Sequence, residues 1–201
     1  MRYVGRRRWL LAIMVVSAVV NFAALSPFAV LIPRQVMLAH HGAVLLGLVY
    51  TVQGATAVVS ATVIGSVWRQ RASLWAMWVL AAVIGVGAAI TGLAARPLPL
   101  LLGSAVIGVG IGFSVLENTV LQQYVASEVM GRVYAVNTAV SYGLTPIGYL
   151  LGGLGGSALG VGPFLILGGA ITAAVITTVG LWSGTGPAAG HPAGADAGLR
   201  S

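Results

Sequence analysis

The stretch WLLAIMVVSAVVNFAALSPFAVLIP, from Trp9 to Pro33, contains no charged side chain. A helix needs about 20 apolar residues to cross the hydrocarbon core of a bilayer. The rest of the chain is similar, because 58% of its 201 residues are hydrophobic and 6% are charged. A soluble domain carries about 25% charged residues. The composition therefore predicts an all-α membrane protein whose main partner is the lipid bilayer.

Six apolar stretches of similar length follow one another along the chain, separated by short breaks that contain arginine, proline or glycine. We expect each stretch to form one transmembrane helix, because its length matches the membrane thickness. The six predicted spans are about 9–33, 42–68, 72–95, 99–122, 133–156 and 161–182. Residues 9–182 are thus expected to form the transmembrane domain, and residues 183–201, rich in glycine, alanine and proline, a disordered cytoplasmic tail.

The arginines predict the orientation of these spans. The chain has ten basic residues, all of them arginine. With a cytoplasmic N-terminus, only Arg34 and Arg96 lie on the outer side, and the other arginines lie inside. The positive-inside rule therefore places both termini in the cytoplasm of a multi-pass protein of the plasma (inner) membrane. The first apolar run is longer than the 7–15 residues typical of a signal-peptide core, so we expect it to be retained.

Several functional classes are disfavoured by the sequence. The chain has no cysteine, and its three histidines do not form a plausible metal set. It contains no phosphate-binding loop and no nucleophile–base pair, so we expect neither an enzyme nor a cofactor. The net charge of +7 is spread between apolar runs, whereas a nucleic-acid partner would need a clustered basic face.

Polar side chains must be hidden from lipid, so their distribution indicates which spans face inward. The first, second, fourth and fifth spans carry amides, hydroxyls and one carboxylate, and the third and sixth are expected to be peripheral. This pattern predicts a 3+3 inverted-repeat arrangement of the kind found in secondary transporters. The alternative is that the polar groups merely pack between helices. The expected cavity-lining residues are Asn21, Tyr50, Gln53, Asn137, Ser141 and Thr145.

Small residues recur at helical spacing and predict close helix packing. The expected packing glycines are Gly108, Gly112, Gly148, Gly152 and Gly156. In the second span, Gly47, Gly54 and Ala61 recur every seven residues. Pro27 and Pro146 are expected to bend their spans, because each removes an internal hydrogen bond.

Two segments resemble the second half of a major facilitator superfamily transporter. NFAALSPFAVLIPRQVMLAHHGAVLLGLVYTVQGATAVVSATVIGSVW is similar to the seventh and eighth helices of that fold, and LENTVLQQYVASEVMGRVYAVNTAVSYGLTPIGYLLGG to the tenth and eleventh. The run LQQYVASEVMGRV matches the LQ..VP....GRV pattern of the macrolide-efflux and siderophore-exporter branch, except that Ala126 replaces the proline. The loop GSVWRQRAS keeps Gly65, Arg69 and Arg71 of a family signature and lacks its aspartate.

The resemblance covers nearly the whole chain, yet such transporters have two six-helix halves. It implies a six-helix half-bundle of the major facilitator fold, with residues 1–8 as the remnant of the cytoplasmic linker between halves. It also implies export of small amphipathic molecules, of drug, macrolide or siderophore type, coupled to protons. A half of this kind needs a first six-helix half or a homodimer mate as its partner.

Glu117 ends a long uncharged stretch, and three interpretations of it remain open. It snorkels to the cytoplasmic headgroups, it pairs with Arg132 or another inner-face arginine to stabilise the inward gate, or it takes up and releases a proton during transport. The expected coupling or gating residues are Glu117, Asn118, Gln122 and Arg132.

Two further classes of protein remain as alternatives to a transporter half. A membrane subunit of an ATP-driven transporter would need an EAA...G coupling loop, and Glu128 lies only three residues before Gly131, which does not fit that spacing. The other alternative is a non-transporting six-helix membrane scaffold.

Overall fold

The computed structural model of the chain describes residues 8–38, 42–67, 73–93 and 96–183. This part of the chain is helical and contains no strand. In chain order its elements are α2 (Arg8–Val19), the π-helix η1 (Val20–Leu25), α3 (Ser26–Leu38), α4 (Gly42–Val67), α5 (Leu74–Leu93), α6 (Pro97–Ile111), α7 (Phe113–Tyr124), α8 (Ser127–Gly143), α9 (Thr145–Ala158) and α10 (Val161–Ser183).

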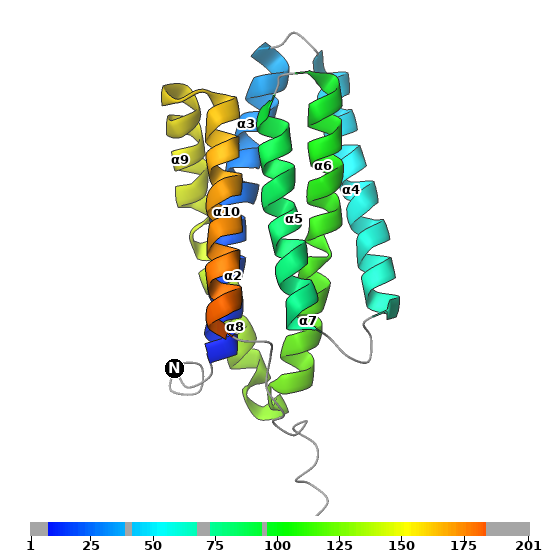
Figure 1. Cartoon of the computed structure of the whole chain (residues 1–201), viewed down its shortest axis with the longest axis vertical. Coiled ribbons are helices and arrows are strands. Elements are labelled where there is room, and N and C mark those ends of the chain that lie inside the picture. The colour runs from blue at the N-terminus through cyan, green and yellow to red at the C-terminus, as the bar shows by residue number, and fades with distance from the viewer. Residues whose placement is uncertain (1–7, 39–41, 68–72, 94–95, 184–201) are drawn as a thin grey trace, which may run out of the picture.

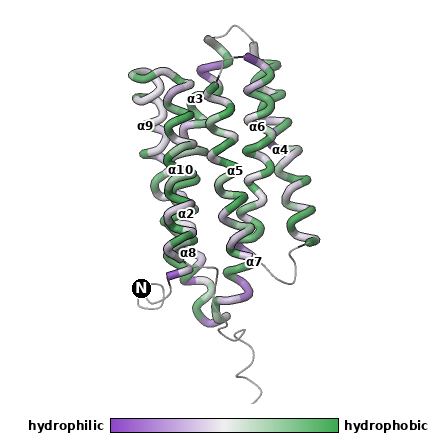
Figure 2. Tube along the Cα trace, viewed as in Figure 1, coloured by the Kyte–Doolittle hydropathy of each residue, from purple (hydrophilic) through white to green (hydrophobic). Residues whose placement is uncertain are grey.

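The helices run side by side along one axis of the molecule (Figure 1). Five helical stretches among the described residues are long and apolar enough to cross a membrane: Arg8–Met37, Gly42–Val67, Leu74–Leu93, Pro97–Tyr124 and Val161–Trp182. Hydrophobic residues predominate along the middle of the bundle, and the deepest hydrophilic colouring appears near its two ends (Figure 2). The start of α2 and the end of α10 lie at the same end (Figure 1).

The first apolar stretch is continuous but irregular at η1. The backbone N–H of Ser26 donates to the carbonyl of Asn21, one residue further back than in an α-helix, and the Ser26 hydroxyl donates to the same oxygen at 2.7 Å. Pro27 follows and has no N–H, so the carbonyl of Ala23 lacks its usual helical donor. The backbone of Gly168 in α10 packs directly against that carbonyl. The expected bend at Pro27 thus takes the form of a π-helical turn.

Two further helices are interrupted. α6 and α7 meet at Gly112, whose N–H bonds to the carbonyls of Val109 and Gly110. The fifth predicted span, 133–156, differs more from expectation, because α8 and α9 cover it as two separate helices that meet at Leu144. Pro146 lies in the first turn of α9, where a missing N–H costs nothing. The expected bend at Pro146 is therefore a helix break.

The third and sixth spans were expected to be peripheral, and the packing core differs from this expectation for the third span. In the most apolar stretch of each helix, 50% of the residues are buried in α5 and 11% in α4. α5 packs extensively against both α10 and α6, and α4 packs mainly on α6. Glycines allow this approach: a Cβ on Gly92 would lie 2.6 Å from the carbonyl oxygen of Gly162. For α5 the absence of polar side chains did not indicate exposure, because backbone-to-backbone packing buries it, whereas 28% of the most apolar stretch of α10 is buried.

α4 contacts the rest of the chain through one narrow face, which includes Leu45, Val49, Ser60 and Ile64. Its other faces expose valines and small residues, and neither Gly47 nor Gly54 has a neighbour within 4 Å of an added Cβ. Two members of the seven-residue repeat, Gly47 and Gly54, therefore do not pack against the described part of the chain. α9 likewise exposes large apolar side chains, among them Leu150 and Leu154.

Candidate functional site

Three helices bring a carboxylate and two hydrogen-bond donors together inside the bundle. The hydroxyl of Ser17 in α2 donates to Oε1 of Glu117 in α7 at 2.6 Å. Nδ2 of Asn137 in α8 donates to the same oxygen at 2.9 Å. The exposed fractions of the three side chains are 2%, 9% and 6%. These contacts stabilise a buried carboxylate, since hydrogen bonds to a charged acceptor are stronger than those between neutral groups.

Each helix that contributes to this cluster is irregular close to it. The π-helix η1 begins three residues after Ser17, the break at Gly112 precedes Glu117, and the break at Leu144 follows Ser141. Irregular backbone at membrane depth is tolerated where it is buried in protein or lines a cavity. In transporters, such discontinuous helices commonly surround substrate and ion sites.

A cavity of about 70 Å³ adjoins the cluster. Its buried wall includes Ser17, Glu117, Asn137 and Ser141. The remaining lining residues are all polar: Asn21, Ser114, Asn118, Tyr134, Thr138 and Tyr142. A polar space of this size holds a few water molecules or one small ion with its ligands.

Some polar atoms beside the carboxylate lack a partner. Oδ1 of Asn137 and Oγ of Ser141 are buried and make no hydrogen bond. Oγ1 of Thr145, one turn further along, is also buried without a partner. Oε2 of Glu117 accepts no hydrogen bond from any residue that the structure describes. Buried polar groups are nearly always hydrogen-bonded, so the oxygens of Asn137 and Ser141 are available to a water molecule or an ion in the cavity.

The structure brings together only part of the expected cavity lining. Asn21 lies on the cavity wall, and its Nδ2 donates to the carbonyl of Ser17 at 2.8 Å. Tyr50 and Gln53 lie on α4 and are not part of this wall. Tyr50 instead packs edge-on against Phe28, with ring centroids 6.3 Å apart. Asn137 and Ser141 line the cavity, whereas Thr145 lies beyond it at the start of α9.

The expected coupling or gating residues also separate. Asn118 lines the cavity one turn after Ser114, and its Nδ2 donates to the Ser114 carbonyl at 2.9 Å. Gln122 is exposed near the end of α7, and Arg132 is exposed on α8. Within the described residues, Glu117 forms no ion pair with Arg132. Its partners are the neutral Ser17 and Asn137 instead.

The five expected packing glycines all lie against neighbouring helices. Gly108 and Gly112 lie against α4, at Thr56 and at Ser60. The three glycines of α9 lie against the first apolar stretch: a Cβ on Gly148 would be 2.7 Å from Cβ of Ser26 and a Cβ on Gly152 3.1 Å from Cα of Pro27, and Gly156 packs on Leu31.

Sequence reasoning missed several cavity residues, although a signal for some of them was present. Ser17 precedes Asn21 by four residues, and Ser114 precedes Asn118 by four, so each pair shares a helix face. Tyr134, Thr138 and Tyr142 are also spaced by four. Following this spacing from the amides Asn21 and Asn118 would have found Ser17 and Ser114, whereas Tyr134, Thr138 and Tyr142 lie on a neighbouring row of α8 that the spacing does not connect to Asn137.

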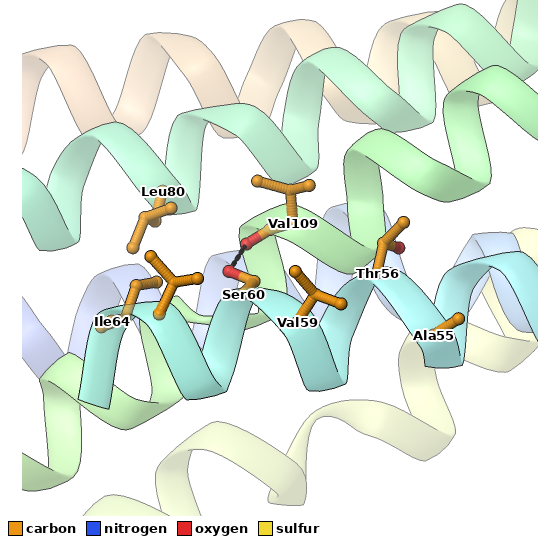
Figure 3. Close-up of a pocket in the computed structure, with 8 residues that line it drawn as sticks. Ala55, Thr56, Val59, Ser60, Ile64, Leu80 and Val109 are labelled. Carbon is orange, nitrogen blue, oxygen red and sulfur yellow. Dashed lines mark hydrogen bonds between the residues drawn. The ribbon is translucent and has the colours of Figure 1, made fainter. Parts of the chain in front are cut away.

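A larger groove of about 450 Å³ lies along α4, bounded by α6 and by Leu80 of α5 (Figure 3). Its lining is apolar apart from two hydroxyls, and both are already satisfied. Ser60 Oγ donates to the Val109 carbonyl at 2.6 Å, and Thr56 Oγ1 donates to the Val52 carbonyl at 2.8 Å. The groove therefore offers apolar contact without a free polar group to orient a ligand.

Comparison with known proteins gives no family assignment, because no family model and no curated protein matches the chain.

Proposed function

We propose that this chain is the second half of a secondary active transporter of the major facilitator type, exporting small amphipathic molecules. The observation that carries the proposal is the hydrogen-bonded cluster of Ser17, Glu117 and Asn137 beside a polar cavity, within a bundle of apolar helices. Ionisable residues inside membrane helices are rare, and they commonly mark substrate or ion pathways.

The proposed topology has six membrane crossings, with α8 and α9 together forming the fifth. α8 and α9 follow one another along the bundle axis, as a broken transmembrane helix would (Figure 1). Both termini are then cytoplasmic in the plasma (inner) membrane, as the arginine bias predicts. The two triplets of spans correspond to the 3+3 inverted repeat of the superfamily.

A partner completes the transporter in this proposal. α4 exposes most of its surface, and α9 exposes Tyr149, Leu150 and Leu154. At the cavity, the tyrosines 134 and 142 are 50% and 61% exposed. Exposed tyrosines beside a polar cavity and exposed apolar side chains on α4 and α9 fit a protein partner, so we assign these surfaces to a first six-helix half or to a second copy of the chain. The substrate path then lies between the two halves.

Glu117 is the coupling group of the proposed transporter. Burying a carboxylate without a cationic partner is costly, and its two hydrogen bonds offset only part of that cost. A proton taken up on Oε2 removes the charge, while Oε1 still accepts the hydrogen bonds that Ser17 and Asn137 donate, and releasing the proton restores the charge that strengthens these bonds. Exchange between these two states supplies a proton-coupled step to the export cycle.

The test is an export assay in cells that lack related exporters. Co-expression with the first half of a macrolide exporter, or a tandem fusion of two copies, should confer drug efflux; efflux from the single chain alone would identify a second copy as the partner. Glu117→Gln should abolish this efflux, while Glu128→Gln should leave it intact, because Glu128 is an exposed carboxylate on α8 outside the cavity. Equal efflux from the Glu117→Gln protein and the unmodified one would reject the proposal.

A further inference from the structure

We propose that the cavity at Glu117 is a binding site for a single sodium ion. The inference goes beyond the proposed proton-coupling role and does not require it, because ion binding is measured on the chain without transport. The site uses side chains from α2, α7 and α8. Each of these helices is followed or preceded by an irregular turn close to the site.

The ligand atoms are the first argument for a hard cation. Oε1 of Glu117 already accepts two hydrogen bonds, which fixes the orientation of the carboxylate and leaves Oε2 free of hydrogen bonds from described residues. Asn137 donates through Nδ2, so its Oδ1 remains available, and Ser141 Oγ is also unpaired. Carboxylate, amide and hydroxyl oxygens are the donors that hard cations prefer.

The burial of these donors is the second argument. Asn137 and Ser141 are 6% and 4% exposed, and each has an oxygen without a partner. An unpaired buried polar atom costs about 1–3 kcal/mol. Both atoms belong to residues that line the cavity beside the carboxylate, so an occupant of the cavity can satisfy them. Because both free atoms can act as acceptors, a cation satisfies them together with the carboxylate.

Charge and size select the kind of cation. The cluster contains one carboxylate and no second acidic side chain, so a monovalent ion leaves the buried site neutral, whereas a divalent ion leaves an excess positive charge in the membrane. The cavity volume of about 70 Å³ suits a small ion with one or two water ligands and excludes a drug-sized molecule.

A sodium ion and a proton are alternative partners of the Glu117 carboxylate. A proton on Glu117 neutralises the same charge that sodium would neutralise, so the two ions compete. Sodium binding draws on Asn137 Oδ1 and Ser141 Oγ in addition, whereas protonation does not require Ser141. Ser141 therefore distinguishes a sodium site from a carboxyl group that only binds protons.

The experiment is equilibrium binding of radioactive sodium to the purified full chain, with choline replacing sodium to hold ionic strength constant. The unmodified chain should bind one ion saturably within physiological sodium concentrations. Glu117→Gln should weaken binding at least about tenfold, because an ionic ligand is lost. Ser141→Ala should weaken it about two- to tenfold, as expected for one neutral ligand. Glu128→Gln should bind like the unmodified chain.

The Ser141→Ala variant also serves as the control for correct folding. Its hydroxyl makes no hydrogen bond, so Ser141→Ala should leave thermal stability in choline unchanged or slightly raised while it lowers sodium affinity. Absence of saturable sodium binding to the unmodified chain overturns the proposal, and so does unchanged sodium affinity in Ser141→Ala. Loss of export activity with intact sodium binding would instead count against the proposed function alone.

Discussion

The hydrogen bond from Ser17 to Glu117 allows a quantitative test of the buried cluster. We consider Ser17→Ala, made both in the unmodified chain and in Glu117→Leu, where the acceptor is gone. The donor and acceptor are 2.6 Å apart, and the two residues are 2% and 9% exposed, so water does not replace the lost bond. A hydrogen bond to a charged group contributes about 1.5–3 kcal/mol in soluble proteins, and bonds between membrane helices contribute about 0.6 kcal/mol on average, with a maximum near 1.7.

The structure places this bond at the upper end of the membrane range, because it is short, charge-assisted and buried. Ser17→Ala should therefore lower the free energy of unfolding by about 1–2 kcal/mol in the unmodified chain and by less than about 0.5 kcal/mol in the Glu117→Leu background. The assay is reversible unfolding in mixed micelles, followed by tryptophan fluorescence. If the effects of the two substitutions on the free energy of unfolding are additive within about 0.5 kcal/mol, Ser17 and Glu117 do not interact, and the hydrogen-bonded cluster described above is refuted.

The remaining predictions concern packing, topology and partnership. Gly148→Ala should destabilise the chain by about 1–3 kcal/mol, because its Cβ would meet Ser26 at 2.7 Å. Gly153→Ala should be neutral or stabilising, because Gly153 has open space around it. Unfolding in micelles measures both free energies. Reporter fusions after Ser73 and at the C-terminus should both score as cytoplasmic, and a periplasmic score at either would refute the topology. Crosslinkable residues placed at Tyr142 should join the chain to its partner half or a second copy, and exclusive labelling by lipid probes there would contradict the assigned interface.

The apolar helices were predictable from the sequence because membrane thickness sets their length. The start of α4 at Gly42, the start of α10 at Val161 and the proline at the start of α6 follow from apolar runs and the helix-terminating residues between them. The π-helical turn at Val20–Leu25 was not predictable, since Pro27 requires some irregularity and the packing of Gly168 against Ala23 decides its form.

The cavity was predictable only in part, because residue spacing identifies a helix face but does not identify the helices that pack against it. The four-residue spacing of Asn137 and Ser141 identifies one face of α8, and the structure places that face at Glu117. Which helices share the cavity depends on how they pack. No sequence pattern indicated that α4 stays outside the cavity, so that Tyr50 and Gln53 do not line it. The pairing of Glu117 with neutral donors rather than with Arg132 likewise follows from the way α2, α7 and α8 meet.

The central claim is that Glu117 couples ion movement to export, and it is tested most directly in proteoliposomes that contain the tandem fusion of two copies. An imposed pH or sodium gradient, without ATP, should drive accumulation of a macrolide probe, and the probe in turn should dissipate the ion gradient. Glu117→Gln should abolish both fluxes, while Glu128→Gln should leave both unchanged. Gradient-driven transport that proceeds at the same rate in the Glu117→Gln protein would contradict the account.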